Sequence, residues 1–278
     1  MIPRPYFSIA IPFFYRNHHS RNQLIRCIKS IRSQLFVDYE IIISTQNCYE
    51  KLISDPELLN IKVLNAEDIG GFIQGNVNNA MKESVGKWIK IMFSDDYFLN
   101  AYALQSIYSF LEETSCNWAI MNSLHVSNNY PTPSKPVISY FQRDILSVNS
   151  IGSPSSIVFI NKNPPLFDIK SWMKLDVDFY YTLYKKYGRP SKVPNTFIVN
   201  ETHSRQFSSL LINQSKETKL KLKNEFVYLC HKHSYYPRNS MRIYFIRLFI
   251  NINRKVSNIM FKISPKLFYK LVNFMESK

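Results

Sequence analysis

The sequence predicts an α/β fold, a mostly parallel sheet flanked by helices, followed by a basic helical tail. First, short apolar segments alternate with segments of helical periodicity over the first half of the chain, which indicates parallel β-α-β units. Second, a strand at 88–93 is followed by the adjacent carboxylates Asp95 and Asp96. Third, the end of the chain, 238–278, holds nine Lys and Arg residues and one acid.

Strands are predicted where β-branched and aromatic residues form short apolar runs, and helices where apolar residues recur every three or four positions. The strands expected are 7–12, 40–43, 61–64, 88–93, 118–121, 156–160 and 196–199. The helices expected are 20–34, 76–84, 101–113 and one that begins near Asp176. The segment 128–136 holds three prolines among polar residues, so it is expected to be the loop that ends the first half.

The composition is that of a folded protein in a reducing compartment. Of the 278 residues, 45% are hydrophobic and 15% are aromatic, which is ample for a core. The four cysteines lack the Cys-x-x-Cys spacing of a zinc site, and they favour buried thiols over a disulfide scaffold. No basic leader with an apolar core precedes the first strand, so we expect the chain to remain in the cytosol.

The carboxylate pair that follows the strand at 88–93 predicts a metal and phosphate site. Adjacent carboxylates repel each other, and at the carboxyl end of a strand they are usually kept together by a divalent cation or a cationic group that both share. Open α/β sheets bind their ligands at this edge. The alternative, from the residues alone, is a turn or a helix N-cap, for which aspartate is well suited.

The tail carries more than half of the chain's net charge of +15, because nine basic residues and one acid give 238–278 a net charge of +8. Aromatic and aliphatic residues interleave with Arg242, Arg247 and Arg254. No uncharged run approaches the roughly 18 to 20 residues that cross a bilayer. A basic amphipathic helix of this kind fits the surface of an anionic membrane. A helix packed on the main domain, or a dimer contact, is the alternative.

Several separated motifs occur in an order known from one family. They are FSIAIP at 7–12, RN at 16–17, SIRSQ at 30–34, EIII at 40–43, Asn78, SVG at 84–86 and SDD at 94–96. From about Phe7 to Leu210 the chain resembles a family 2 glycosyltransferase with the GT-A fold, of the bacterial surface-polysaccharide (O-antigen or capsule) type. The resemblance implies a Rossmann-like, mostly parallel central sheet.

The resemblance also implies a division of the chain. A GT-A domain would occupy 1–225, with a nucleotide-binding half at about 1–127 and an acceptor half at about 137–225. Residues 226–278 would then form the basic amphipathic helical region.

A metal-dependent transfer from a nucleotide sugar is the activity that the resemblance implies. Asp96 would hold Mn²⁺ or Mg²⁺, which neutralises the charge that develops on the leaving diphosphate, and Asp95 would lie nearer the ribose or the sugar. His203 lies in a segment similar to the family's late His-x-x-Gln motif, which makes it a second metal ligand or a diphosphate contact. A solvated loop histidine is the equal alternative.

The implied nucleotide and sugar contacts come from several places in the chain. They are Pro12, Phe14, Arg16, Thr45, Gln46, Asn78, Asp95 and Ser153. One departure from the family lies at the end of the second strand, where an aspartate is usual and this chain has Thr45 and Gln46. Both side chains can hydrogen-bond a base, but they lack the charge. The choice among UDP, dTDP and GDP donors therefore stays open. A catalytically inactive protein also stays an open alternative.

Asp176 matches the position of the family's catalytic base, which takes the proton from the acceptor hydroxyl in an inverting transfer. The family usually has a Glu before this Asp, and Leu175 stands there in this chain, so Asp178 is a second candidate. From the residues alone, both acids are explained as negative charge at a helix N-terminus.

The leading hypothesis is an inverting glycosyltransferase of the hexosyltransferase class in O-antigen or capsule synthesis, peripheral on the inner face of a bacterial cell membrane. Its acceptor is expected to be a glycan linked to polyprenyl diphosphate. A silent nucleotide-binding or scaffold protein is the second hypothesis. A nucleic-acid-binding protein is disfavoured, because the basic charge lies in an apolar-rich tail and no recognition motif is present.

Overall fold

A computed structural model describes residues 4–127, 136–202 and 216–235 of the chain. The chain divides into two compact units, Met1–Phe226 and Val227–Lys278. Three predictions lie outside the described residues: the loop 128–136 except for its last residue, the metal ligand His203, and the tail beyond residue 235. Within the described ranges, no helix combines the length and the apolar character needed to cross a membrane.

One sheet runs through the first unit. Among the described residues it has eight strands, in the spatial order β3-β2-β1-β4-β7-β6-β8-β5. The strands are β1 (Phe7–Phe13), β2 (Tyr39–Thr45), β3 (Lys62–Asn65), β4 (Trp88–Ile91), β5 (Asp96–Phe98), β6 (Trp118–Ser127), β7 (Ile157–Ile160) and β8 (Ser191–Thr202).

The half of the sheet built by β3, β2, β1 and β4 is parallel, as the alternation of strands and helices predicts. β1 lies between β2 and β4, and every residue of β1 is buried. A strand that is covered on both faces needs a continuous apolar sequence, which 7–13 has. The carboxyl ends of β1, β2 and β4 therefore meet at one edge of the sheet.

The other half of the sheet is mixed. β6 and β8 are parallel, whereas β7 runs antiparallel between β4 and β6, and β5 pairs antiparallel with β8. The prediction of a mostly parallel sheet thus describes β3-β2-β1-β4 and β6-β8. The antiparallel strand β7 joins these two groups, and the antiparallel strand β5 lies at the outer edge beside β8. β5 was not predicted, and it begins at Asp96 itself.

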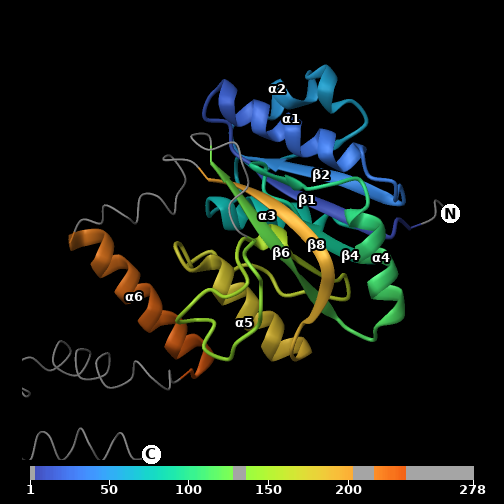
Figure 1. Cartoon of the computed structure of the whole chain (residues 1–278). Coiled ribbons are helices and arrows are strands. Elements are labelled where there is room, and N and C mark those ends of the chain that lie inside the picture. Colours follow the sequence, from blue (N-terminus) through green and yellow to red (C-terminus); the bar gives the residue numbers. More distant parts are fainter. Residues whose placement is uncertain (1–3, 128–135, 203–215, 236–278) are drawn as a thin grey trace, which may run out of the picture. The chain divides into compact units, whose positions relative to one another are not determined.

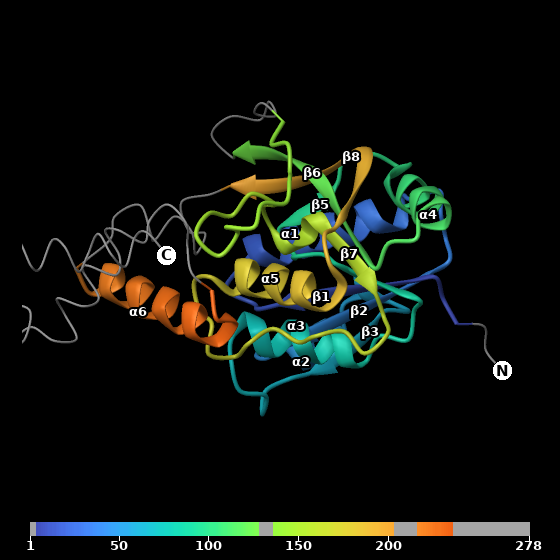
Figure 2. The same cartoon turned by 90° about the horizontal axis from the view of Figure 1, so that it is seen from below.

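Helices cover both faces of this sheet (Figures 1 and 2). α1 (His18–Arg32) and α4 (Ala103–Glu113) share one core with β1. α3 (Ile73–Lys82) and α5 (Leu175–Tyr187) lie on the opposite face, in front of the sheet in Figure 2. The remaining helices are α2 (Tyr49–Ile53), two 3₁₀ turns at Pro56–Leu58 and Pro154–Ser156, and α6 (Lys216–His233).

α1 begins two residues before its predicted start, because the sequence supplies a cap there. Oδ1 of Asn17 accepts a hydrogen bond from the backbone N of Ser20 at 3.1 Å, and the Ser20 hydroxyl accepts one from the backbone N of Asn17 at 3.2 Å. The apolar stripe predicted from the periodicity is buried. Its residues are Leu24, Cys27, Ile28 and Ile31.

Gly86 allows the chain before β4 to approach β1 closely. A Cβ at this position would stand 2.5 Å from the backbone N of Ser8 and 2.7 Å from the carbonyl carbon of Phe7. The backbone N of Gly86 also donates to Oγ of Ser8 at 2.7 Å. Only glycine fits here without moving one of the two strands.

Candidate active site

Asp96 lies buried at the start of β5, with 3% of its surface exposed. It stands opposite Asn200 of β8, and its Oδ2 accepts a hydrogen bond from the Ser153 hydroxyl at 2.8 Å. The backbone N of Asp96 donates to the carbonyl of Phe93 at 2.9 Å, which closes the turn that carries Asp95. Both carboxylates thus follow β4 at the carboxyl edge of the sheet, as the sequence predicts.

The charge of Asp96 is unfavourable in this position. Burial, and then the neighbouring charge of Asp95, raise the pKa of Asp96 from its ordinary value of 3.8 to about 7. The side chains of Ser155, Asn200 and Ser153 lower the pKa but do not offset the burial. A cation beside Asp96 would stabilise the ionised form of this carboxylate.

Lys90 is a fully buried amine that shares this environment. Its Nζ donates to the backbone oxygen of Ile91 at 2.6 Å and to that of Ser155. Burial lowers the pKa of Lys90 to about 7, while the nearby charge of Asp96 opposes that change. Lys90 therefore ties the 3₁₀ turn at Pro154–Ser156 to the end of β4.

A buried ion pair supports the backbone of the Asp95 turn. Glu201 of β8, whose side chain is 3% exposed, accepts hydrogen bonds from the guanidinium of Arg26 and from Nε2 of Gln23, the latter at 3.0 Å. Nη2 of Arg26 also donates to the backbone oxygen of Asp95 at 3.1 Å. The guanidinium lies over the Tyr97 ring, 4.5 Å from its centroid. Arg26 thus joins α1, β8 and the carboxylate turn.

One loop connects Asp96 to Asp176. Nδ2 of Asn149 donates to Oδ2 of Asp176 at 2.6 Å and to the backbone oxygen of Gly152 at 3.0 Å. Gly152 has a φ of +106°, a conformation that favours glycine. Ser153 follows directly and donates to Asp96. The two carboxylates, from different elements, are therefore both hydrogen-bonded to one loop, Asp176 through Asn149 and Asp96 through Ser153.

Asp176 and Asp178 both lie in the first turn of α5, but Asp178 is 1% exposed and Asp176 is half-buried. Burial raises the pKa of Asp176 to about 6, although the backbone N–H of Val177, the charge of Lys174 and the amide of Asn149 lower it. An accessible carboxylate with a pKa just below neutrality suits a general base.

Three of the predicted nucleotide contacts lie at or beyond the carboxyl end of β1. Pro12 is buried within the strand, while Phe14 and Arg16 are exposed after it. This end of β1 adjoins the ends of β2 and β4. The structure thus brings these residues to the edge that holds Asp95 and Asp96.

The two residues that replace the family's aspartate are already engaged within the protein. Thr45, at the end of β2, is buried, and its Oγ1 lies 3.0 Å from Sγ of Cys48. Nε2 of Gln46 donates to the backbone oxygens of Ile69 at 2.9 Å and Gly71 at 2.6 Å. Gln46 therefore holds the loop that follows β3 against the end of β2.

Asn78 of α3 bonds to protein backbone. Its Nδ2 donates to the carbonyl of Phe167 at 2.8 Å, and its Oδ1 accepts from the backbone N of Phe167 at 2.8 Å. The Phe167 ring stacks on Phe179 of α5, with 3.9 Å between the centroids. Asn78 therefore fixes the segment that leads into α5.

The side chains around Asp96 fit a hard divalent cation. Carboxylate and amide oxygens are preferred ligands of Mg²⁺ and Mn²⁺. Asn200 is 6% exposed, and its side-chain amide lowers the pKa of Asp96. Among the described residues, the amide O and N of Asn200 have no hydrogen-bond partner of normal geometry. The described ranges contain no group of three or more His, Cys, Asp and Glu side chains placed to hold a metal, and His203 lies outside them.

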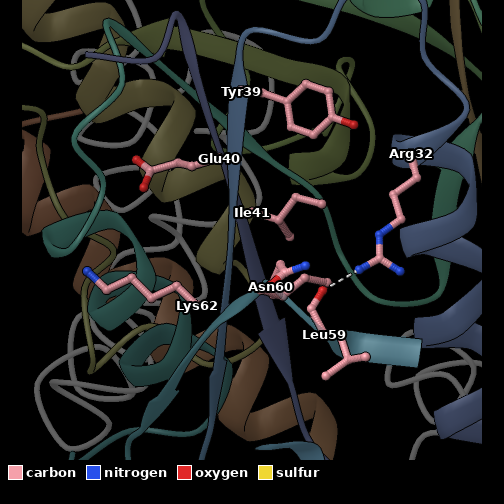
Figure 3. Close-up of a pocket in the computed structure, with 8 residues that line it drawn as sticks. Arg32, Tyr39, Glu40, Ile41, Leu59, Asn60 and Lys62 are labelled. Carbon is pink, nitrogen blue, oxygen red and sulfur yellow. Dashed lines mark hydrogen bonds between the residues drawn. The ribbon is translucent and has the colours of Figure 1, made fainter. Parts of the chain in front are cut away.

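A cavity of about 610 Å³ lies elsewhere, at the amino ends of β2 and β3 (Figure 3). Its two positive residues are engaged: Arg32 donates to the backbone oxygen of Leu59 at 2.7 Å, and Lys62 pairs with Glu83 at 2.7 Å. This cavity is at the opposite end of the strands from Asp96, so it is separate from the candidate active site.

No protein-family model and no curated protein matches the chain, but solved structures do. Residues 1–349 of S. aureus TarS in complex with UDP match with a TM-score of 0.54 and 17% identity, over 85% of this chain and 74% of that one. The same TarS fragment with UDP-GlcNAc matches with a TM-score of 0.53 and 18% identity, over 85% and 75%. A longer S. aureus TarS structure matches over 81% and 43%, with a TM-score of 0.54 and 18% identity.

The chain shares its fold with these TarS structures, and this is the GT-A-like fold that the sequence predicts. The predicted fold class is thereby confirmed. Within this GT-A fold, five polar residues around the two carboxylates had not been predicted as site residues: Arg26, Lys90, Asn149, Asn200 and Glu201. Asn149 lies four positions before Ser153, which the resemblance implied as a nucleotide or sugar contact. Arg26 and Glu201 are 175 positions apart, so no local pattern connects them.

Proposed function

We propose that this chain is an inverting glycosyltransferase that moves a sugar from a nucleotide sugar to a hydroxyl group of a glycan. The observation that carries the proposal is the loop that joins Asp96 to Asp176 by hydrogen bonds. It links a paired-carboxylate site, at the edge where open α/β sheets bind nucleotides, to a separate half-buried carboxylate. The GT-A fold, shared with TarS structures that contain UDP and UDP-GlcNAc, supports the choice of a nucleotide-sugar donor.

In the proposed reaction, Asp176 accepts the proton of the acceptor hydroxyl while the oxygen forms a bond to the anomeric carbon of the donor. The bond from that carbon to the diphosphate oxygen breaks, and the diphosphate leaves with the electron pair. Asn149 and the backbone N–H of Val177 donate to the two oxygens of Asp176, at 2.6 and 2.8 Å, and so orient the carboxylate. With a pKa of about 6, Asp176 is ionised at neutral pH.

We propose that Asp96 holds Mn²⁺ or Mg²⁺, with His203 as a further ligand, and that Asp95 lies nearer the ribose or the sugar of the donor. The bound ion supplies positive charge that stabilises the leaving diphosphate. Arg26 keeps the Asp95 backbone in place through its hydrogen bond to the carbonyl oxygen. The raised pKa of Asp96 supports a cation site, since a cation would favour its charged form.

We assign the nucleotide to the ends of β1 and β2, where Phe14 and Arg16 are exposed and Gln46 orders the following loop. UDP is the first nucleotide to test, because the TarS structures contain it. Sugars carried on dTDP and GDP are the other donors to test.

The acceptor is proposed to be a glycan carried on polyprenyl diphosphate, in O-antigen or capsule synthesis. The support is the net charge of +8 in 238–278, which suits a protein that reaches an anionic membrane from the cytoplasmic side. The enzyme would then work as a peripheral protein of the inner face of the cell membrane.

The first experiment measures release of nucleoside diphosphate from a panel of UDP, dTDP and GDP sugars, with Mn²⁺ or with EDTA. Wild type is compared with Asp96→Ala and Asp176→Asn. Asp38→Asn is the matched control, because Asp38 is exposed just before β2, at the end of the strands away from the site. We expect release from one donor that requires the metal, is lost in both site variants and persists in the control.

Other outcomes separate the remaining functions. Donor binding by calorimetry without any release, even with lipid-linked acceptors, would identify a silent nucleotide-binding protein. Binding to DNA that weakens steeply with salt, with no affinity for any sugar nucleotide, would overturn the proposal in favour of a nucleic-acid-binding protein.

A further inference from the structure

Glu225 of α6 is a buried carboxylate that accepts five hydrogen bonds from four consecutive residues. It is 9% exposed. Its Oε1 accepts from Oγ of Ser171 at 2.9 Å and from the backbone N of Trp172 at 2.6 Å, of Met173 at 3.0 Å and of Lys174 at 2.9 Å, while Oε2 accepts from the backbone N of Met173 at 2.9 Å.

These four residues lead directly into α5. The N-cap of α5 is Lys174, whose side chain makes no capping hydrogen bond. The backbone N–H groups at the start of a helix need acceptors from outside the helix, and a negative charge is favoured there. Glu225 supplies both from a position more than 50 residues away along the chain.

The base Asp176 is two residues beyond Lys174, so the backbone that Glu225 holds directs the side chain of the base. Lys174 is fixed a second time, since its Nζ donates to the backbone oxygen of Leu146 at 3.1 Å. Asp176 must meet the amide of Asn149, which belongs to another loop, at 2.6 Å. A displacement of the α5 start by about 1 Å would break this contact and move the base away from the acceptor hydroxyl.

We propose that Glu225 is the positioning residue for Asp176, acting through the backbone of 172–174, and that it serves proton transfer and not donor binding. The inference rests on the proposed function. The donor-side groups Asp95 and Asp96 are held by other residues, among them Arg26 and Ser153, and none of these contacts involves Glu225.

The test compares Glu225→Gln and Glu225→Ala with the wild-type full chain. Glu217→Gln is the matched control, since Glu217 lies on the same helix and makes only an exposed pair with Lys221 at 2.9 Å. The measurements are kcat, the KM for the donor, calorimetric binding of UDP, and hydrogen exchange of the 172–174 amides. A ¹³C NMR titration of the Asp176 carboxyl reports on the base without turnover.

Glutamine keeps one of the two acceptor oxygens of Glu225, so we expect Glu225→Gln to lower kcat less than Glu225→Ala does. kcat should fall about tenfold in Glu225→Gln and about hundredfold in Glu225→Ala, with donor KM and UDP affinity within about twofold of wild type. Exchange of the 172–174 amides should become faster, the titration of Asp176 should change, and Glu217→Gln should match wild type.

The inference is overturned if kcat in Glu225→Ala equals that of wild type, or if donor KM rises as much as kcat falls. If Glu225→Ala does not fold, Glu225→Gln decides by the same criteria. If the wild type transfers no sugar, the proposed function fails. Unchanged amide exchange and an unchanged Asp176 titration in Glu225→Gln would then refute the positioning role separately, whereas changes in both would uphold it.

Discussion

The side-chain amide of Asn149 lies 2.6 Å from Oδ2 of Asp176, and its oxygen accepts the backbone N–H groups of Ile151 at 3.0 Å and Gly152 at 2.9 Å. The oxygen of Asn149 therefore shapes its own loop, while Nδ2 orients the proposed base and also donates to the Gly152 carbonyl. Aspartate at this position keeps the acceptor oxygen and loses both of the bonds that Nδ2 donates.

In Asn149→Asp, the second carboxylate repels the charge of Asp176, so the pKa of the base should rise above its present value of about 6. Since the base must be ionised, kcat/KM falls as the pH drops through that pKa, and the acidic limb of the pH profile should move upward by about one pH unit or more. Ser150→Ala, which removes a hydrogen bond to the Tyr140 carbonyl in the same loop, is the control and should leave the limb in place. A limb near pH 6 in both variants would contradict the role of Asn149.

Asp96→Asn should stabilise the ligand-free protein at pH 8. The folded-state pKa of Asp96 is raised from 3.8 to about 7, so its stabilising contribution is present below pH 3.8 and is lost as the pH rises through 7. That rise corresponds to at most about 4 kcal/mol. Lys90, with a pKa of about 7, is mostly neutral at pH 8 and loses little when its negative neighbour is removed.

The measurement for Asp96→Asn is urea unfolding with EDTA at pH 5 and pH 8. The gain should be large at pH 8 and small at pH 5, whereas Asp38→Asn should show no such difference. A variant less stable than wild type at both pH values would show that the carboxylate is well accommodated.

Replacing Arg26 by Leu should lower the free energy of unfolding by about 2 kcal/mol. This is less than the loss expected on breaking a fully buried ion pair, because the Arg26 side chain is 39% exposed, although that of Glu201 is 3% exposed. The donor KM should also rise, by about tenfold, because the Asp95 backbone loses its support. Removing both charges, in Arg26→Leu with Glu201→Leu, should restore stability and leave the donor KM high. Recovery of both properties would mean that Arg26 acts only through the ion pair.

Gly86→Ala should destabilise the fold by about 2 kcal/mol, because the new Cβ would lie 2.5 Å from the backbone of Ser8, where neither strand can yield freely. Gly70→Ala is the matched control, since a Cβ at Gly70 meets no atom within 4 Å. Urea midpoints of the two variants give the comparison. Equal midpoints would show that β1 and the segment before β4 are not held together as described.

Elements with a local signal were predictable from the sequence. The buried run of β1, the apolar stripe of α1 and the Asp95–Asp96 pair each carry their pattern within a few residues, and the structure has all three. The start of α1 was two residues off because the capping box at Asn17 was not recognised. β5 was missed because three residues, 96–98, carry no periodicity, and their pairing depends on β8.

The support around the site could not be predicted in the same way. Asp176 was predicted through a family resemblance, but nothing in the sequence marks Glu225 as the residue that binds the backbone before α5, since single glutamates in helices are usually solvated. Arg26 and Glu201 come together only when α1 and β8 pack at the same edge of the sheet. Such contacts depend on how the strands and helices are arranged in space. A single sequence indicates that arrangement only through its local periodicity.

The pairing of Asp96 with Asn200 also sets when the site can form during synthesis. β1 to β4 can assemble from the first 91 residues, since within the described ranges these strands pair with one another and, in the case of β4, also with β7. The strand partner of β5 among the described residues is β8, Ser191–Thr202. A nascent chain that still lacks β8 therefore carries Asp96 without its strand partner, and on the proposed function donor affinity should be acquired late, when long-range contacts close.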